Sequence, residues 1–254
     1  MPLDQATMYA FFLVFIRCSG MMIAAPMFGA ANAPASIRVY ATLAISMALT
    51  ALIQPGVGPI PTDLGAFGLS IANEAVAGIL IGSFFSLVLH AATMAGAFID
   101  LQMGLGLSQA LNPLTGVPVT VLAQFKYLLC LIVFLRIDAH HLMLGSFLHS
   151  YQTMPTLTAS MLPHLESSLV DLVASMTMLA LQMAAPVAAV SFVVDAALGL
   201  VNRAVPQMPA LLVGLPAKVL MGLIALSIGL PALVGTVEQG VQRTTDAISR
   251  SLGE

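Results

Sequence analysis

The chain has 254 residues, of which 59% are hydrophobic and 7% are charged. A soluble globular domain carries about 25% charged residues, so this composition indicates an integral membrane protein. The formal net charge of −3 at pH 7 argues against a nucleic-acid partner and against a basic membrane-surface patch. Cys18 and Cys130 both lie in apolar runs and suggest neither a disulfide framework nor a metal site.

The apolar segments predict an all-α integral membrane protein with about six to eight apolar helices, some of them in bent hairpins. Asp4 precedes the first segment, where a secretory signal peptide would carry positive charge, so we expect no cleaved signal. In chain order the segments cover approximately residues 8–30, 37–53, 64–108, 117–135, 165–205 and 208–234.

Two of these segments are too long for a single crossing, which needs about 20 residues. Residues 64–108 therefore predict two helices or one bent hairpin, with a break near His90–Gly96. Residues 165–205 contain Pro186, which predicts a kink. Beyond the last segment, residues 235–254 alternate charged and apolar positions, which predicts a short amphipathic helix at the membrane interface.

Almost every apolar segment contains an ionisable residue well inside it. Each such residue costs about 2.5–3.5 kcal/mol at a helix centre on membrane-insertion scales. Three are acidic and three are basic, which favours pairing between helices. The chain also has no Trp and only four Tyr, so it lacks a pronounced aromatic belt. Both features fit helices surrounded mostly by other protein chains. The residues are Arg17, Glu74, Asp100, Lys126, Asp195 and Lys218.

The stretch 104–121 loses the helical pattern that precedes it. Its Gly, Asn and Pro residues are typical of turns, yet no charge occurs between Asp100 and Lys126. Irregular backbone is tolerated at membrane depth only where protein or a water-filled cavity satisfies its N–H and C=O groups. An ordinary surface loop and a pore loop are both compatible with this spacing. The loop residues of interest are Gly104, Leu105, Gly106, Ser108, Leu111, Asn112, Pro113, Leu114, Gly116, Val117 and Pro118.

The sequence offers little catalytic or metal chemistry. His140 and His141 are neighbours that do not share a helix face, and no Cys or carboxylate supplies ligand spacing, so we predict no metal site. Ser108 lies in a Gly-rich turn but not in a nucleophile elbow, and no partnered base is visible. No phosphate-binding loop occurs either. We therefore predict a protein that is not an enzyme and carries no cofactor.

Four sequence blocks, in matching order, resemble the flagellar biosynthetic protein R family (FliR), over about residues 8–235. The injectisome export-apparatus protein T is a wider relative. The blocks are the stretch from Arg17 to Arg38, EAVAGILIG from Glu74, GAFIDLQMGLGLSQALNP from Gly96 to Pro113, and Asp195-x3-Gly-Leu-x2-Arg203-x2-Pro-Gln. Together they are far more specific than any one of them.

This resemblance implies a subunit of the type III protein-export gate, in which P-type, Q-type and R subunits wind into a pore-containing cone lifted largely out of the bilayer plane. Residues 1–164 would correspond to a P-type subunit and residues 165–234 to a Q-type hairpin, followed by the amphipathic tail 235–254. The stretch 104–121 would lie in the pore as a plug. The resemblance adds Arg203 to the six ionisable residues of the apolar segments. All seven are expected to be buried and to contribute to assembly.

The resemblance further implies P-type and Q-type partners, the B-type export-switch protein and unfolded export substrates. It also implies a multi-pass location in the bacterial inner membrane, within the flagellar basal body. Arg243 and Arg250 favour a cytoplasmic C-terminus. The chain departs from the family at Asn112, where Asp is common, at Asp100, where Gly is usual, and at Met208-Pro209, where an Asn-containing stretch is usual.

Two alternatives remain open. An injectisome export-gate subunit would share most of the same blocks. An ion-coupled secondary transporter would also use broken helices and membrane carboxylates such as Asp100 and Asp195. A transporter predicts an inverted repeat, and comparing the two halves of the chain reveals none.

Overall fold

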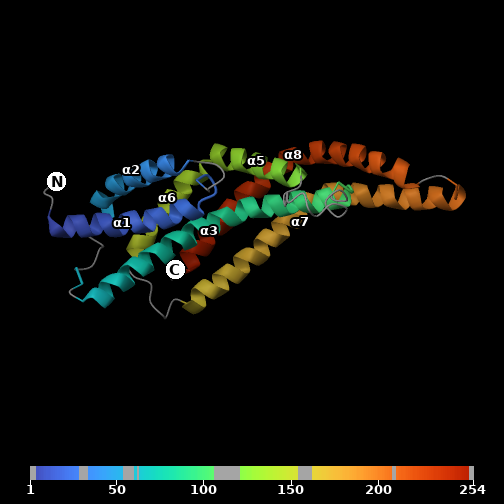
Figure 1. The fold of residues 1–254 in the computed structure, drawn as a ribbon. Coiled ribbons are helices and arrows are strands. Elements are labelled where there is room, and N and C mark those ends of the chain that lie inside the picture. The colour runs from blue at the N-terminus through green and yellow to red at the C-terminus, as the bar shows by residue number, and fades with distance from the viewer. Residues whose placement is uncertain are drawn as a thin grey trace. The chain divides into compact units, whose positions relative to one another are not determined.

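The structure is a computed structural model that describes residues 4–28, 34–53, 60–61, 63–105, 121–153, 162–207 and 210–251. Apart from short turns these residues are helical, and none of them lies in a strand. The helices are α1 (Gln5–Ala24), α2 (Ala35–Ile53), α3 (Leu64–Gln102), α5 (Val121–Arg136), α6 (Ala139–Thr153), α7 (Leu162–Ala204) and α8 (Ala210–Ser251) (Figure 1).

Five of these helices, α1, α2, α3, α7 and α8, are long and apolar enough to cross a membrane, and the count is six if α5 and α6 form one broken span. The prediction of an all-α integral membrane protein is confirmed. Helices α3, α7 and α8 have 39, 43 and 42 residues. If straight, each would measure about 58–65 Å, roughly twice the hydrocarbon core. Each therefore extends beyond that core or lies strongly tilted in it.

The predicted break near His90–Gly96 is wrong, because α3 continues without interruption to Gln102. No proline lies in this helix, and Gly96 is closely packed: a Cβ added to it would meet backbone atoms of Leu122 and Ala123. Helix α7 likewise continues through Pro186. Hydropathy gives the length of an apolar segment, but it does not distinguish one long helix from a hairpin.

The C-terminal tail is the end of α8 and not a separate short helix. Val237, Val241, Thr244 and Ile248 follow one another at spacings of four, three and four, and all are buried. One face of this part of α8 is therefore buried within the chain. The expected amphipathic tail at the membrane interface stays a prediction.

The chain divides into two compact units. Unit 1 contains Met1–Val88, Leu135–Ala174 and Val241–Glu254, and unit 2 contains Leu89–Phe134 and Ser175–Gly240. The division crosses α3, α5, α7 and α8, so each unit combines segments from distant parts of the sequence. The division expected from the family resemblance follows the chain instead, and it stays a prediction.

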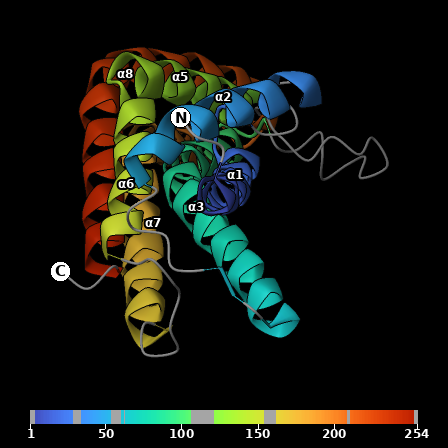
Figure 2. The same cartoon turned by 90° about the vertical axis from the view of Figure 1, so that its left-hand side faces the viewer.

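Helix α1 is central to unit 1, where it packs against α2 and lies beside the N-terminal half of α3 (Figure 2). The backbones of α1 and α3 approach closely at glycines. A Cβ on Gly78 would overlap the carbonyl group of Arg17, and a Cβ on Gly20 would lie 2.7 Å from the carbonyl oxygen of Ala75. Only glycine allows these two helices to come so near to each other.

Replacing Gly78 with Ala should destabilise the protein by about 1–3 kcal/mol, because the added methyl group meets backbone atoms that cannot rotate away. The measurement is thermal unfolding of the purified protein in detergent. Gly68→Ala is the matched control on the same helix, since nothing lies within 4 Å of its added Cβ. Equal melting temperatures for the two variants would contradict the proposed close contact.

Candidate functional site

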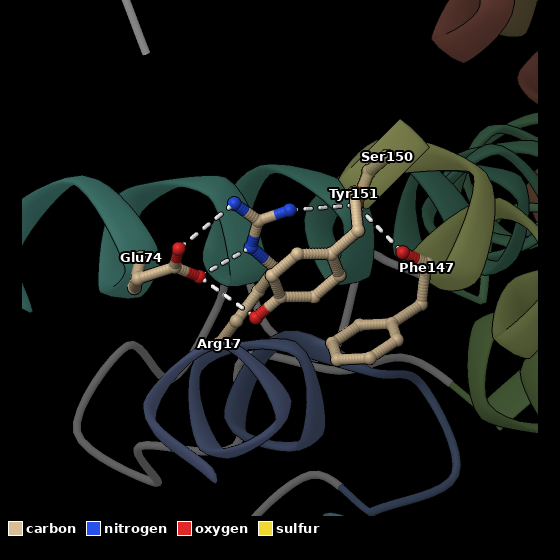
Figure 3. A network of polar contacts seen from close by, with 5 residues as sticks. All are labelled: Arg17, Glu74, Phe147, Ser150 and Tyr151. Carbon is tan, nitrogen blue, oxygen red and sulfur yellow. Dashed lines mark hydrogen bonds and ion pairs between the residues drawn. The ribbon is translucent and has the colours of Figure 1, made fainter. Parts of the chain in front are cut away.

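A buried ion pair joins α1 to α3 in unit 1. The Nε of Arg17 donates to Oε2 of Glu74 at 2.6 Å, and its Nη2 donates to Oε1 at 3.1 Å (Figure 3). Both residues are almost fully buried. Two parallel bonds between a guanidinium and a carboxylate give the strongest and most directional form of ion pair.

Helix α6 completes this network. The Oγ of Ser150 accepts from Nη1 of Arg17 at 3.0 Å and donates to the carbonyl oxygen of Phe147. The hydroxyl of Tyr151 donates to Oε2 of Glu74 at 2.9 Å, and its ring lies 3.7 Å from Cζ of Arg17 (Figure 3). The guanidinium of Arg17 and the carboxylate of Glu74 thus each bind further partners besides one another. The arrangement is structural, because all of these groups are engaged in holding the three helices together.

Local sequence explains how the network forms. The buried residues of α1 include Ala10, Val14, Arg17 and Met21, at spacings that put them on one helix face. Phe147 and Tyr151 are four residues apart on α6, and their rings pack edge to face. The sequence analysis did not single out Ser150 or Tyr151. Both lie in the polar run His149–Thr153, and such a run does not identify a partner in a distant helix.

In unit 2, Asp100 and Lys126 are both buried but do not pair with each other. The Oδ2 of Asp100 accepts from the backbone N–H groups of Leu122 and Ala123 at 3.0 and 3.2 Å. The Nζ of Lys126 donates to the carbonyl oxygen of Met183 at 3.0 Å, three residues before Pro186. Within the described residues both side chains thus bind backbone groups of neighbouring helices. The sequence analysis did not assign partners to these two charges, and pairing with other chains stays a prediction.

Asp195 and Lys218 form an ion pair with a distance of 2.6 Å between Nζ and Oδ1, and it joins α7 to α8. The Asp195 side chain is 50% exposed, and Arg203 on α7 is exposed as well. Neither residue is buried within the chain by itself, so their expected burial in an assembly stays a prediction. The pair borders a hollow of about 310 Å³, which is also lined by Leu198, Gly199, Asn202, Gly214 and Leu215.

Only the two ends of the expected pore loop lie in the described part of the chain. Gly104 has a φ of 77°, its N–H donates to Leu101, and the N–H of Leu105 donates to Asp100. This is the Schellman arrangement, in which a left-handed residue, usually Gly, ends a helix. The expected loop residues outside the described residues are Gly106, Ser108, Leu111, Asn112, Pro113, Leu114, Gly116, Val117 and Pro118.

The turn between α5 and α6 brings Asp138 next to both neighbouring histidines. Its Oδ1 lies 3.5 Å from Nδ1 of His141 and 3.9 Å from Nε2 of His140. The sequence argument overlooked this carboxylate. The Asp138 and His141 side chains are 69% exposed, and mixed exposed clusters of this kind are common without an ion, so we assign no metal here.

Replacing Glu74 with Gln should destabilise the protein by about 3–5 kcal/mol, because the charge of Arg17 stays buried without a counter-charge. Thermal unfolding in detergent and the amount of folded protein in membranes measure the effect. Removing both charges with Arg17→Met and Glu74→Met should cost less than the two single changes added together. The control is Asp195→Asn, which removes a half-exposed pair and should cost about 0–1 kcal/mol. Equal losses for Glu74→Gln and Asp195→Asn would contradict the central role of the buried pair.

Comparison with known proteins agrees with the sequence and the fold. The family described as "Bacterial export proteins, family 1" matches residues 8–244. The flagellar biosynthetic protein FliR of Caulobacter vibrioides is 34% identical over 89% of this chain and 90% of its own. FliR of Bacillus subtilis is 31% identical over 96% and 94%. The surface presentation of antigens protein SpaR of Salmonella typhimurium is 29% identical over 67% and 66%. The chain therefore belongs to family 1 of the bacterial export proteins.

Proposed function

We propose that this chain is a membrane subunit of a type III protein-export gate, and that it serves the export of flagellar subunits. The proposal rests on the family match, which covers residues 8–244 and so omits only the first three residues of α1 and the end of α8 among the described helices. The flagellar relatives align over a larger share of the chain than SpaR does, which favours the flagellum. An injectisome gate subunit is the alternative that the SpaR similarity supports.

The exposed surface of the helices supports assembly with other chains. In each of the helices α2, α7 and α8, only 22% of the most apolar 18-residue stretch is buried within the chain. The same helices carry Asp195 and Arg203, whose exposed charges are costly in lipid. P-type and Q-type gate subunits would cover the apolar faces and shield these charges from lipid. The B-type export-switch protein is a further partner in this proposal.

The stretch 104–121 would close the channel at rest and move aside for unfolded export substrates. It contains no charge, and a charge facing a narrow pore would select ions and hold oppositely charged segments. Its glycines and prolines suit a segment of low local stability. Gly104, at the first end, already has the left-handed backbone that glycine favours. Leu111, Leu114 and Val117 would form the apolar closure.

The proposed location is the bacterial inner membrane, within the flagellar basal body, with several crossings. The C-terminus would be cytoplasmic, because Arg243 and Arg250 lie near the end of α8 and positive charges favour that side.

Expressed alone, the chain should be poorly stable in detergent, because its apolar faces and its exposed intramembrane charges are not covered by other subunits. Co-expression with P-type and Q-type subunits should give one large complex, since binding to the folded state stabilises it. Size-exclusion chromatography and native mass analysis of both preparations test this. A monodisperse and thermally robust monomer from the chain alone would count strongly against the gate.

Deleting residues 108–115 should leave the complex assembled but make cells leak small ions or dyes when the gate is overproduced. The reason is that this deletion removes Leu111 and Leu114, two of the three residues of the proposed apolar closure, and lies outside the described helices. A deletion in the connection 54–59 is the control for loop shortening in general. If the 108–115 variant fails to assemble, the segment is needed for the structure of the complex. If the variant assembles and does not leak, another part of the complex closes the channel.

A further inference from the structure

The hollow beside the pair of Asp195 and Lys218 is kept open by two glycines. Nothing lies within 4 Å of a Cβ added to Gly199, so the space that a larger side chain would fill there is empty. A Cβ on Gly214 would lie 2.8 Å from Cδ1 of Leu198, so glycine at this position lets the leucine pack against α8. The resulting volume of 310 Å³ lies in the range of small-ligand sites, about 300–1,000 Å³.

The hollow combines both signs of charge with unused hydrogen-bonding capacity. The Nζ of Lys218 binds Oδ1 of Asp195 at 2.6 Å. An ammonium group has three donors and a carboxylate has two acceptor oxygens, so this single contact leaves most of both groups unused. Neither side chain has a further partner within the described part of the chain. The exposed amide of Asn202 adds a neutral donor and acceptor to the same lining.

The position of the pair along both helices matches the depth of lipid headgroups. Residues 172–194 of α7 and 219–237 of α8 contain no charged residue, and Asp195 and Lys218 directly adjoin these stretches. At 1.5 Å per residue the stretches measure about 34 and 28 Å, close to the hydrocarbon core of about 30 Å. Because the two charges bind each other, they end both stretches at one level. That level is the edge of the hydrocarbon, where headgroups begin.

We propose that this hollow binds the headgroup of an ethanolamine phospholipid. The ammonium of the headgroup donates to the unused oxygen of Asp195, and its phosphate accepts from Lys218. The two dipoles then lie antiparallel, and each charge gains a counter-charge. Lipid hydrocarbon would leave both charges unsatisfied, and a single charged side chain of another subunit would satisfy only one of them. The acyl chains would follow the exposed side chains of Phe192 and Leu220, on the hydrocarbon side of the pair.

The test measures lipid binding by native mass spectrometry on the full chain, purified from membranes with the subunits that it retains. Added phosphatidylethanolamine should bind once per copy of the chain. Gly199→Leu fills the hollow, so the contacts to both charges are lost and binding should weaken by about tenfold or more. The open surroundings of Gly199 allow this variant to fold. Gly235→Leu is the matched control on α8, because its added Cβ is equally free and lies outside the hollow.

Headgroup selectivity separates recognition of both charges from recognition of the phosphate alone. Phosphatidylglycerol has the phosphate but no ammonium, and it should bind more weakly than phosphatidylethanolamine. Asp195→Asn should weaken binding of phosphatidylethanolamine about tenfold, as expected for loss of one charge-assisted hydrogen bond, and leave phosphatidylglycerol unchanged. This variant keeps the size of the side chain, so it also serves if Gly199→Leu does not fold. Free phosphoethanolamine at the same concentration should not displace the lipid, because it has no acyl chains.

Three results overturn the site. Equal binding of the two lipids to the unsubstituted chain shows that the ammonium is not recognised. Unchanged binding of phosphatidylethanolamine in both Gly199→Leu and Asp195→Asn places the lipid elsewhere. If the unsubstituted chain binds no lipid and Gly199→Leu loses the other subunits while Gly235→Leu keeps them, the hollow is a subunit contact. The site needs only α7, α8 and the membrane, so a preparation without other gate subunits contradicts the proposed function and leaves the lipid measurement valid.

Discussion

The ion pair between Arg17 and Glu74 is the interaction on which unit 1 depends. Neither charge is tolerated alone inside an apolar helix bundle, and each finds its full set of partners only when α1, α3 and α6 are all in place. A shift of α1 along α3 by one turn, about 5.4 Å, would separate the two charges. The network therefore selects one alignment of the helices from many that hydrophobic burial alone would accept.

Backbone packing selects the same alignment independently. Gly78 follows Glu74 by four residues, so both face α1 from the same side of α3. The side chain of Arg17 binds Glu74 while its carbonyl group contacts Gly78. One residue of α1 is thus fixed by its side chain and by its main chain at two successive turns of α3. Steric fit and charge pairing support each other, which is typical of a site that defines a single structure.

The local features of the sequence predicted the class of the fold and the residues of its central pair. Composition and hydropathy indicate membrane helices, and the cost of a charge in such a helix marks Arg17 and Glu74. The sequence could not supply Ser150 and Tyr151, which lie 133 and 77 residues from the groups they bind. The length of an apolar run likewise left α3 ambiguous, because hydropathy does not distinguish one helix of 39 residues from a hairpin of two shorter ones.

The two units satisfy their buried charges in different ways. Unit 1 uses side chains from three regular helices, whereas unit 2 uses backbone groups of neighbouring helices. Asp100 accepts from the N–H groups that start α5, which have no acceptor within that helix. Lys126 donates to a main-chain carbonyl oxygen of α7, which has a second lone pair to offer beside its helical bond. In unit 2 the main chain of neighbouring helices therefore supplies the partners that side chains supply in unit 1, and each of these two charges fixes one helix to the backbone of another.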